Sequence, residues 1–140
     1  MRGVSRRLGL ALSAAAVFAA IAVPTQASSD THRYSGKTAQ KFHLSVETGK
    51  GTITLLRFKI RLRCRDGSLL FDDLSDFEPA RLRGGGRFSD LQAGPTDEVV
   101  WRGRLGGTKV SGIVRVRDEL KSGVPCDSGS VGFAARQGGK

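Results

Sequence analysis

The stretch that decides the fold is "LRFKIRLRC", which runs from Leu56 to Cys64. Apolar residues and cations alternate along it, and every second side chain of a β-strand points to the same face of a sheet. The sequence therefore predicts a long, half-buried strand. The expected buried row is Leu56, Phe58, Ile60, Leu62 and Cys64. The expected outer row, called the basic row below, is Arg57, Lys59, Arg61, Arg63 and Arg65.

Other short segments with strand character flank this one, and glycine-containing turns separate them. The clearest is a hairpin that joins residues 99–105 to residues 108–116 through Gly106-Gly107, with Trp101 opposite Gly112. No long helical period follows the first 27 residues. About seven or eight short strands predict an all-β domain, either an antiparallel β-sandwich or a small β-barrel.

The N-terminus is typical of a signal peptide that forms a helix. Three arginines precede an uncharged, mostly apolar stretch at 8–23, and small residues precede a cleavage site near Ala27. An uncleaved anchor is the alternative, but the stretch is short beside the roughly 20 residues of a spanning helix. We expect a signal peptide at 1–27, an extended lead-in at 28–38, a β-domain at 39–136 and a flexible tail at 137–140. The sequence leaves the general and twin-arginine export routes open.

The chain is basic, with 23 Lys and Arg against 13 Asp and Glu and a net charge of +10. Removal of residues 1–27 takes away three arginines and no acidic residue, so 20 basic and 13 acidic residues remain, for a net charge of +7. Only two cysteines occur, Cys64 and Cys126. In an exported chain such a pair is expected to form a disulfide. A reactive thiol or metal pair is the alternative, and neither His32 nor His43 lies at metal-ligand spacing from a cysteine.

The basic row is the candidate binding site. Five cations spaced by two residues repel one another unless solvent, nearby acidic residues or an external polyanion offsets them. A solvated face is the simplest interpretation. The alternative is contact with an anionic polysaccharide, a wall polymer or a phospholipid surface. Nucleic acid is disfavoured by the compartment and by the scarcity of aromatic residues for stacking. The oligomeric state stays open.

An acidic stretch gives the competing hypotheses. It contains Asp72, Asp73, Asp76 and Glu78 and is expected to be a loop at 72–78. Clustered carboxylates suit Ca²⁺, and a carboxylate pair suits a glycan-acting hydrolase. A solvated loop is the simpler interpretation. No other catalytic, phosphate-binding or cofactor motif is present. The "GGG" at 84–86 is interpreted as a turn, and an anion-binding nest with Arg87 is the alternative. We therefore expect a non-enzymatic protein without metal or cofactor, or a purely structural extracellular module.

Three segments support a family resemblance. They are "YSGKTAQ" at 34–40, "GGRFS" at 85–89 and "CDSGSVGFAAR" at 126–136. Together they resemble a family of small secreted β-rich proteins of GC-rich Gram-positive bacteria, with a Tyr-x-Gly-x-Thr-x-Gln start and a Cys-x-Ser/Thr-Gly-x-Val-x-aromatic-x-Ala-Arg end. The resemblance implies an exported β-rich fold with one disulfide, and it carries over no catalytic residue.

Overall fold

The structure is a computed structural model that describes residues 30–138. Residues 1–27, the expected signal peptide, lie outside the described part. The described chain forms ten strands and one short 3-10 turn, η1 (Gly84–Gly86). The strands are β1 (His32–Thr38), β2 (His43–Gly49), β3 (Thr52–Cys64), β4 (Leu69–Ser75), β5 (Ala80–Arg81), β6 (Arg87–Ala93), β7 (Glu98–Gly106), β8 (Lys109–Glu119), β9 (Pro125–Asp127) and β10 (Val131–Gln137).

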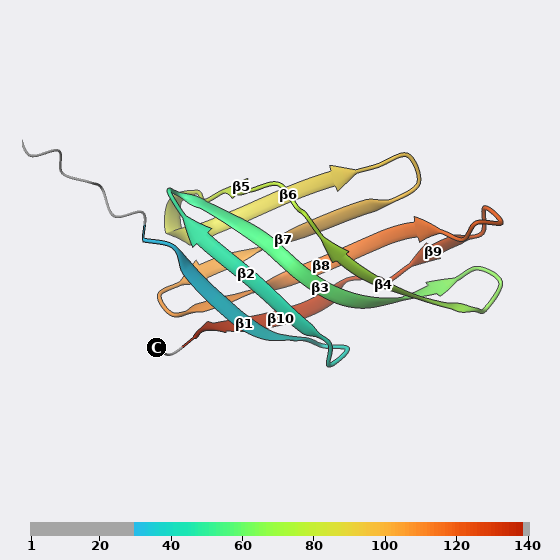
Figure 1. The fold of residues 1–140 in the computed structure, drawn as a ribbon, viewed down its shortest axis with the longest axis horizontal. Coiled ribbons are helices and arrows are strands. Elements are labelled where there is room, and N and C mark those ends of the chain that lie inside the picture. Colours follow the sequence, from blue (N-terminus) through green and yellow to red (C-terminus); the bar gives the residue numbers. More distant parts are fainter. Residues whose placement is uncertain (1–29, 139–140) are drawn as a thin grey trace, which may run out of the picture.

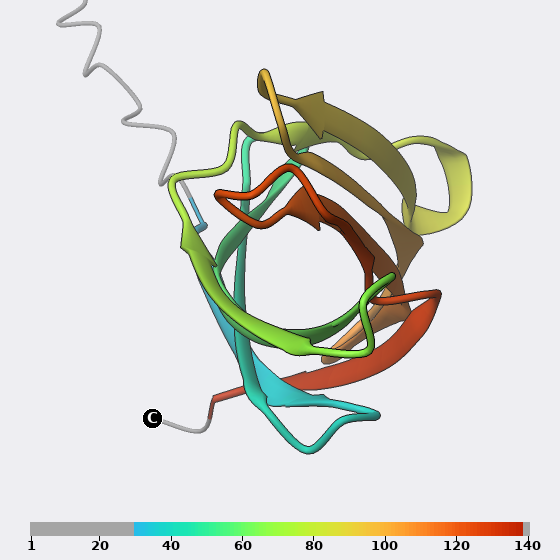
Figure 2. The same cartoon turned by 90° about the vertical axis from the view of Figure 1, so that its right-hand side faces the viewer.

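The sheet closes into a barrel. Antiparallel ladders join β10, β1, β2, β3, β9 and β8 in that order, and β8 also pairs with β10. This is a closed six-stranded ring, and the strands lie around it in Figure 2. Four more strands lie outside the ring: β7 and β6 extend the sheet from β8, while β4 and β5 pair with β3 (Figure 1). Of the two architectures that the sequence left open, the protein therefore forms the barrel.

Apolar side chains fill the interior. The largest fully buried ones include Trp101 and Phe58, and the ring of Phe88 lies 4.6 Å from that of Trp101 between centroids. The predicted inward rows of the basic strand and of the last strand are confirmed, apart from Leu56. The buried residues of the two predicted rows are Phe58, Ile60, Leu62, Cys64, Val131, Phe133 and Ala135. The inner space is thus a packed core rather than a channel.

The disulfide is present. Cys64 on β3 and Cys126 on β9 lie directly opposite each other in the ladder and are bonded through their sulfur atoms. Both are buried, at 4% and 3% exposure. The bond therefore fastens the end of the long basic strand to the short strand that closes the ring.

The expected lead-in is a strand of the barrel. β1 pairs with β2 on one edge and with β10 on the other. It lacks an apolar period because its inner positions hold Tyr34, Gly36 and Thr38. A Cβ at Gly36 would lie 2.6 Å from the Cα of Ala135, so β1 and β10 approach too closely for a larger side chain. Because these inner residues are small or polar, the sequence pattern did not predict a strand here.

A β-bulge moves Leu56 out of the predicted buried row. The register of β2 with β3 shifts between Ser45, which lies opposite Arg57, and Val46, which lies opposite Leu55. Leu56 is the extra residue and is only half-buried, while Leu55 and Phe58 are both buried. Because Leu55 and Leu56 are both apolar, alternation alone could not show where the phase of the strand changes.

The β7–β8 hairpin forms with a register two residues from the predicted one. Gly106 pairs with Lys109, so the turn is Gly107-Thr108 instead of Gly106-Gly107. Trp101 lies opposite Val114, and Gly112 lies opposite Gly103. A shift of two keeps each side chain on its predicted face. The two backbones approach so closely here that only glycine fits, because a Cβ on Gly112 would lie 2.7 Å from the Cα of Gly103.

Candidate anion-binding surfaces

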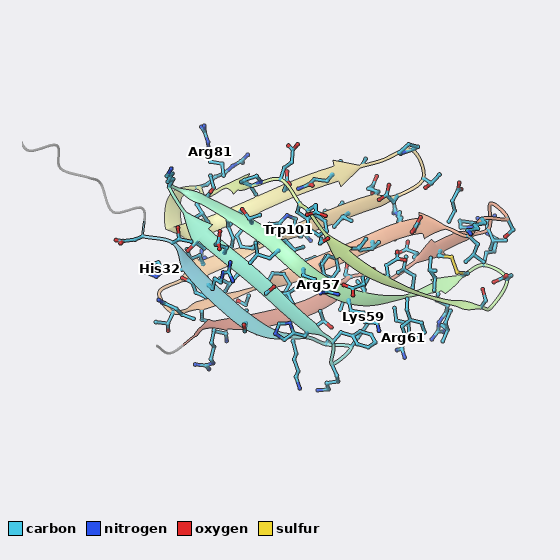
Figure 3. The ribbon with its side chains drawn as sticks, viewed as in Figure 1. His32, Arg57, Lys59, Arg61, Arg81 and Trp101 are labelled. Carbon is cyan, nitrogen blue, oxygen red and sulfur yellow. A yellow bond between two sulfur atoms is a disulfide. The ribbon has the colours of Figure 1, made fainter. Side chains whose placement is uncertain are left out.

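The basic row lies on the outer face of β3. Arg57, Lys59, Arg61 and Arg63 are exposed, because the strand alternates regularly after the bulge. Figure 3 shows Arg57, Lys59 and Arg61 in succession along this strand. Arg65 is also exposed but follows the end of β3. The structure thus places the five predicted residues along one side of one element and its following turn.

One cation of the row is neutralised within the fold. Arg57 Nε donates to Asp73 Oδ1 at 2.9 Å, and Arg57 Nη2 donates to Asp73 Oδ2 at 2.6 Å. This two-point hydrogen bond raises the pKa of Arg57 and lowers the pKa of Asp73. Both side chains are largely exposed. Asp73, from the acidic stretch, therefore offsets part of the positive charge of the basic row. Offset by nearby acidic residues is one of the three possibilities that the sequence left open.

The other four cations form no ion pair with any residue of the part that the structure describes. Lys59 Nζ lies 5.8 Å from the centre of the Phe42 ring, a cation–π contact that leaves its charge in place. Gln40 bonds the backbone N–H and carbonyl of Arg61 through its side-chain amide. The guanidinium of Arg61 is not used in these bonds, so the centre of the row remains available to an anion.

Exposed apolar side chains lie beside these cations. In the β3–β4 ladder Phe71 is opposite Arg61, and Leu69 is opposite Arg63. Phe71 is 52% exposed and Leu69 is 50% exposed. The edge of Phe71 also contacts the ring of Phe42, with 6.1 Å between centroids. The outer face of β3 and β4 therefore combines positive charge with apolar area, a combination that arises only because the ladder places Leu69 and Phe71 beside the basic row.

Only the second half of the acidic stretch is a loop, since Asp76 and Glu78 lie between β4 and β5. Asp72 and Asp73 belong to β4, so their side chains leave opposite faces of the strand. The loop prediction was wrong for residues 72–75, because pairing with β3 extends β4 to Ser75 with alternating exposure of its side chains. Asp73 binds Arg57, whereas Asp76 bonds only Ser75 within the described residues. The four carboxylates are therefore not gathered into a pair, and residues 30–138 contain no group of three or more His, Cys, Asp or Glu suited to a metal.

Asp72 points away from the basic row. Burial raises the pKa of Asp72 to about 6, and a hydrogen bond and the charge of Asp118, together with the charge of Asp97, add to the effect. Its Oδ2 atom is buried without a hydrogen-bond partner. The neutral form of Asp72 is therefore favoured by burial and by the negative charges of Asp118 and Asp97.

The two histidines and the ion pair of Arg115 with Asp127 make contacts within the fold and belong to neither candidate surface. His32 Nδ1 lies 3.0 Å from Gln137 Nε2, and His43 is exposed on β2. Arg115 bonds Asp127 at two points, 3.0 and 2.5 Å, and Arg117 approaches the same carboxylate at 3.4 Å. These contacts lower the pKa of Asp127 to about 2. They hold the chain where β9 ends beside β8.

A second basic cluster lines an open surface cavity of about 770 Å³ on the outer side of β6, β7 and β8. We call it the arginine cleft, and its cations are Arg83, Arg87, Arg102 and Arg104. Arg102 and Arg104 lie on the exposed face of the β7–β8 hairpin, and their connection with Arg83 and Arg87 was missed in the sequence. The signal was the "RGGGR" turn, which brings its two flanking arginines together beside that hairpin.

Comparison with protein-family models, curated proteins and solved structures gave no match to the chain. The family resemblance of the three segments therefore stays a prediction. None of the helices in the described residues is long and apolar enough to cross a membrane. The disulfide is consistent with an extracytoplasmic location.

Proposed function

We propose that this chain is an exported, non-enzymatic β-barrel domain that binds an anionic polymer or surface of the cell envelope through the outer face of β3 and β4. The observation that carries the proposal is that Lys59, Arg61 and Arg63 lie in one exposed row and form no ion pair with any residue between 30 and 138. A wall polymer, an acidic polysaccharide or an anionic phospholipid surface would supply the missing countercharge. The dispersed carboxylates favour this function over a glycan-acting hydrolase.

Retention on immobilised polyanions tests the proposal. Oxidised residues 28–140 are passed over dextran sulfate and polyphosphate columns and eluted with salt. Charge-driven binding is expected to weaken steeply as the salt concentration rises. Arg61→Ser with Arg63→Ser should elute at clearly lower salt. The control is Lys121→Ser with Arg136→Ser, which removes the same charge from exposed positions outside the row. Equal elution of the two double variants would refute the proposed face.

A vesicle assay separates the two kinds of partner. Leu69→Ser with Phe71→Ser removes the exposed apolar area and leaves every cation in place. If the partner is a lipid surface, less of this variant than of the wild type should sediment with phosphatidylglycerol vesicles, since apolar area adds to electrostatic attraction there. Unchanged behaviour in both assays would point to a soluble polymer. No retention of the wild-type chain on columns or vesicles would overturn the function itself.

A further inference from the structure

The arginine cleft is a second concentration of positive charge, separate from the basic row. The "GGG" turn holds two of its members together: the N–H of Arg83 donates to the carbonyl of Arg87 at 2.7 Å, and the N–H of Gly86 donates to the carbonyl of Arg83 at 3.0 Å. The β6–β7 ladder then places Arg104 directly opposite Arg87. Arg83, Arg87 and Arg104 therefore lie side by side on three neighbouring backbone segments. Arg102 lies two residues from Arg104 on β7.

Nothing within the described residues neutralises this cluster. The residues that line the cleft include no Asp or Glu, and none of the four arginines takes part in an ion pair in residues 30–138. Like charges placed directly opposite each other in a sheet destabilise it. The pair of Arg87 and Arg104 thus opposes folding unless an anion lies between them. Asp73 and Asp127 supply that anion for Arg57 and Arg115, whereas the cleft has no equivalent.

The cleft also has room for more than a solvated ion. Its volume of about 770 Å³ lies within the range of small-molecule sites. Gly103 and Gly112 face each other across the β7–β8 ladder and add no side chain to the lining. Ile113 supplies apolar area beside them, whereas Phe88 lines the cleft from a nearly buried position, at 3% exposure. A ligand with a compact, highly charged group and a small remaining portion fits this combination.

We propose that the arginine cleft binds a small ligand that carries a diphosphate group. The planar guanidinium group donates two parallel hydrogen bonds to a phosphate, and several guanidinium groups around one cavity select a ligand with more than one negative charge. The terminal and bridging oxygens of a diphosphate offer acceptors to more than two arginines at once. This inference does not depend on the function proposed for β3, because the two sites share no residue.

The only tryptophan of the chain reports on the site. Trp101 is fully buried, and its ring packs against Phe88, which lines the cleft. Titration with inorganic pyrophosphate should change the Trp101 emission along a saturable curve, and calorimetry should give the same dissociation constant. Inorganic phosphate and sulfate should bind at least about tenfold more weakly, since they engage fewer arginines. Comparison of pyrophosphate with ADP shows whether the apolar lining contributes to affinity.

Two double variants make the inference falsifiable. Arg87→Gln with Arg104→Gln should weaken pyrophosphate binding at least about tenfold, while Lys121→Gln with Arg136→Gln, at exposed positions outside both basic surfaces, should leave it unchanged. Without ligand, the Arg87/Arg104 variant should unfold at an equal or higher denaturant concentration than the wild type, because repulsion is removed. Absence of pyrophosphate binding to the wild type, or equal binding by both variants, would overturn the proposal. Loss of stability in the Arg87/Arg104 variant would show that these arginines serve the fold instead.

Discussion

Asp73 binds Arg57, although Lys59 is the residue directly opposite it in the β3–β4 ladder. Arginine matches a carboxylate at two points, and lysine offers only a point charge, so the diagonal contact replaces the direct one. Lys59 instead lies over the ring of Phe42. The single acidic residue on this face therefore masks the first cation of the row and leaves the next three exposed to solvent.

Removal of that acidic residue should strengthen binding by the proposed surface. Asp73→Asn keeps the size of the side chain but frees the charge of Arg57, so the outer face gains one positive charge. We expect elution from dextran sulfate at a higher salt concentration and a steeper dependence on salt. Asp66→Asn, at an exposed turn after the strand, is the control for total charge. Equal increases in the two variants would mean that net charge, rather than this face, determines retention.

Loss of the disulfide should cost much of the stability. Cys64 and Cys126 are separated by 62 positions, and closure of a loop of this size stabilises the fold by roughly 4 kcal/mol in the chain-entropy model. We expect Cys64→Ala with Cys126→Ala to lower the denaturation midpoint strongly, as measured by urea titration followed at Trp101. Wild-type protein unfolded with a reductant should match this variant. If reduction left the midpoint unchanged, the bond would add nothing to stability.

Asp72 should make stability fall between about pH 4 and pH 6. Its pKa is raised to about 6 in the fold from 3.8, so the folded state binds more protons over this interval than the unfolded state. The favourable contribution of the neutral carboxyl is complete below about pH 4 and is lost as the pH rises through 6. Because the group is only partly buried, about 1 kcal/mol is expected. Asp72→Asn should abolish this fall in urea midpoints, and an unchanged profile would contradict the shift.

Asp127 should act in the opposite direction at lower pH. Its pKa is lowered to about 2 by the hydrogen bonds from Arg115 and Gly129 and by Arg117. The unfolded state therefore binds more protons between about pH 4 and pH 2, and stability falls as the solution is acidified. We expect Asp127→Asn to cost about 1 kcal/mol at pH 7, after allowance for its partial exposure, and much less at pH 2. An equal loss at both values would show that shape rather than charge is responsible.

A methyl group at Gly112 should destabilise the β7–β8 hairpin. The added Cβ would overlap the carbonyl oxygen of Arg102 and lie 2.7 Å from the Cα of Gly103. Both contacts involve backbone, so the strands must separate, at an expected cost of about 1–3 kcal/mol. Gly132→Ala on β10 is the matched control, because its nearest neighbour would be 4.0 Å away. Comparable midpoints for the two variants would contradict the close approach of Gly103 and Gly112.

Alternation was sufficient to predict much of this fold. The outer and inner rows from Arg57 to Cys64 were correct, because a polar/apolar period of two has one structural interpretation. The disulfide followed from the number of cysteines. Alternation failed where inner positions are not apolar, as in β1, and where two adjacent residues are both apolar, as at Leu55 and Leu56. It also could not fix the register of a hairpin whose strands and turn all contain glycine.

The candidate sites depended on tertiary structure to different degrees. The basic row lies within one strand and its following turn, so its residues could be identified from the alternation of the sequence alone. The arginine cleft combines a turn, β6 and β7, and its members become neighbours only through ladder pairing. The sequence placed Asp72 and Asp73 together as one acidic group, whereas the strand sends one to Asp118 and the other to Arg57. Charges that are adjacent in sequence are thus on opposite sides of the sheet.

The pairing of β1 with β10 brings the two ends of residues 30–138 side by side. Tyr34 lies opposite Gln137, and the N–H of Gly138 donates to the carbonyl of Arg33 at 3.1 Å. A short linker can therefore join the two ends, with new ends opened in the exposed turn at 121–122. In such a circular permutant every ladder is preserved, yet the same two cysteines enclose β10, β1, β2 and β3 instead of β4–β8. The crosslink would then constrain the opposite half of the unfolded chain while the native barrel stays the same.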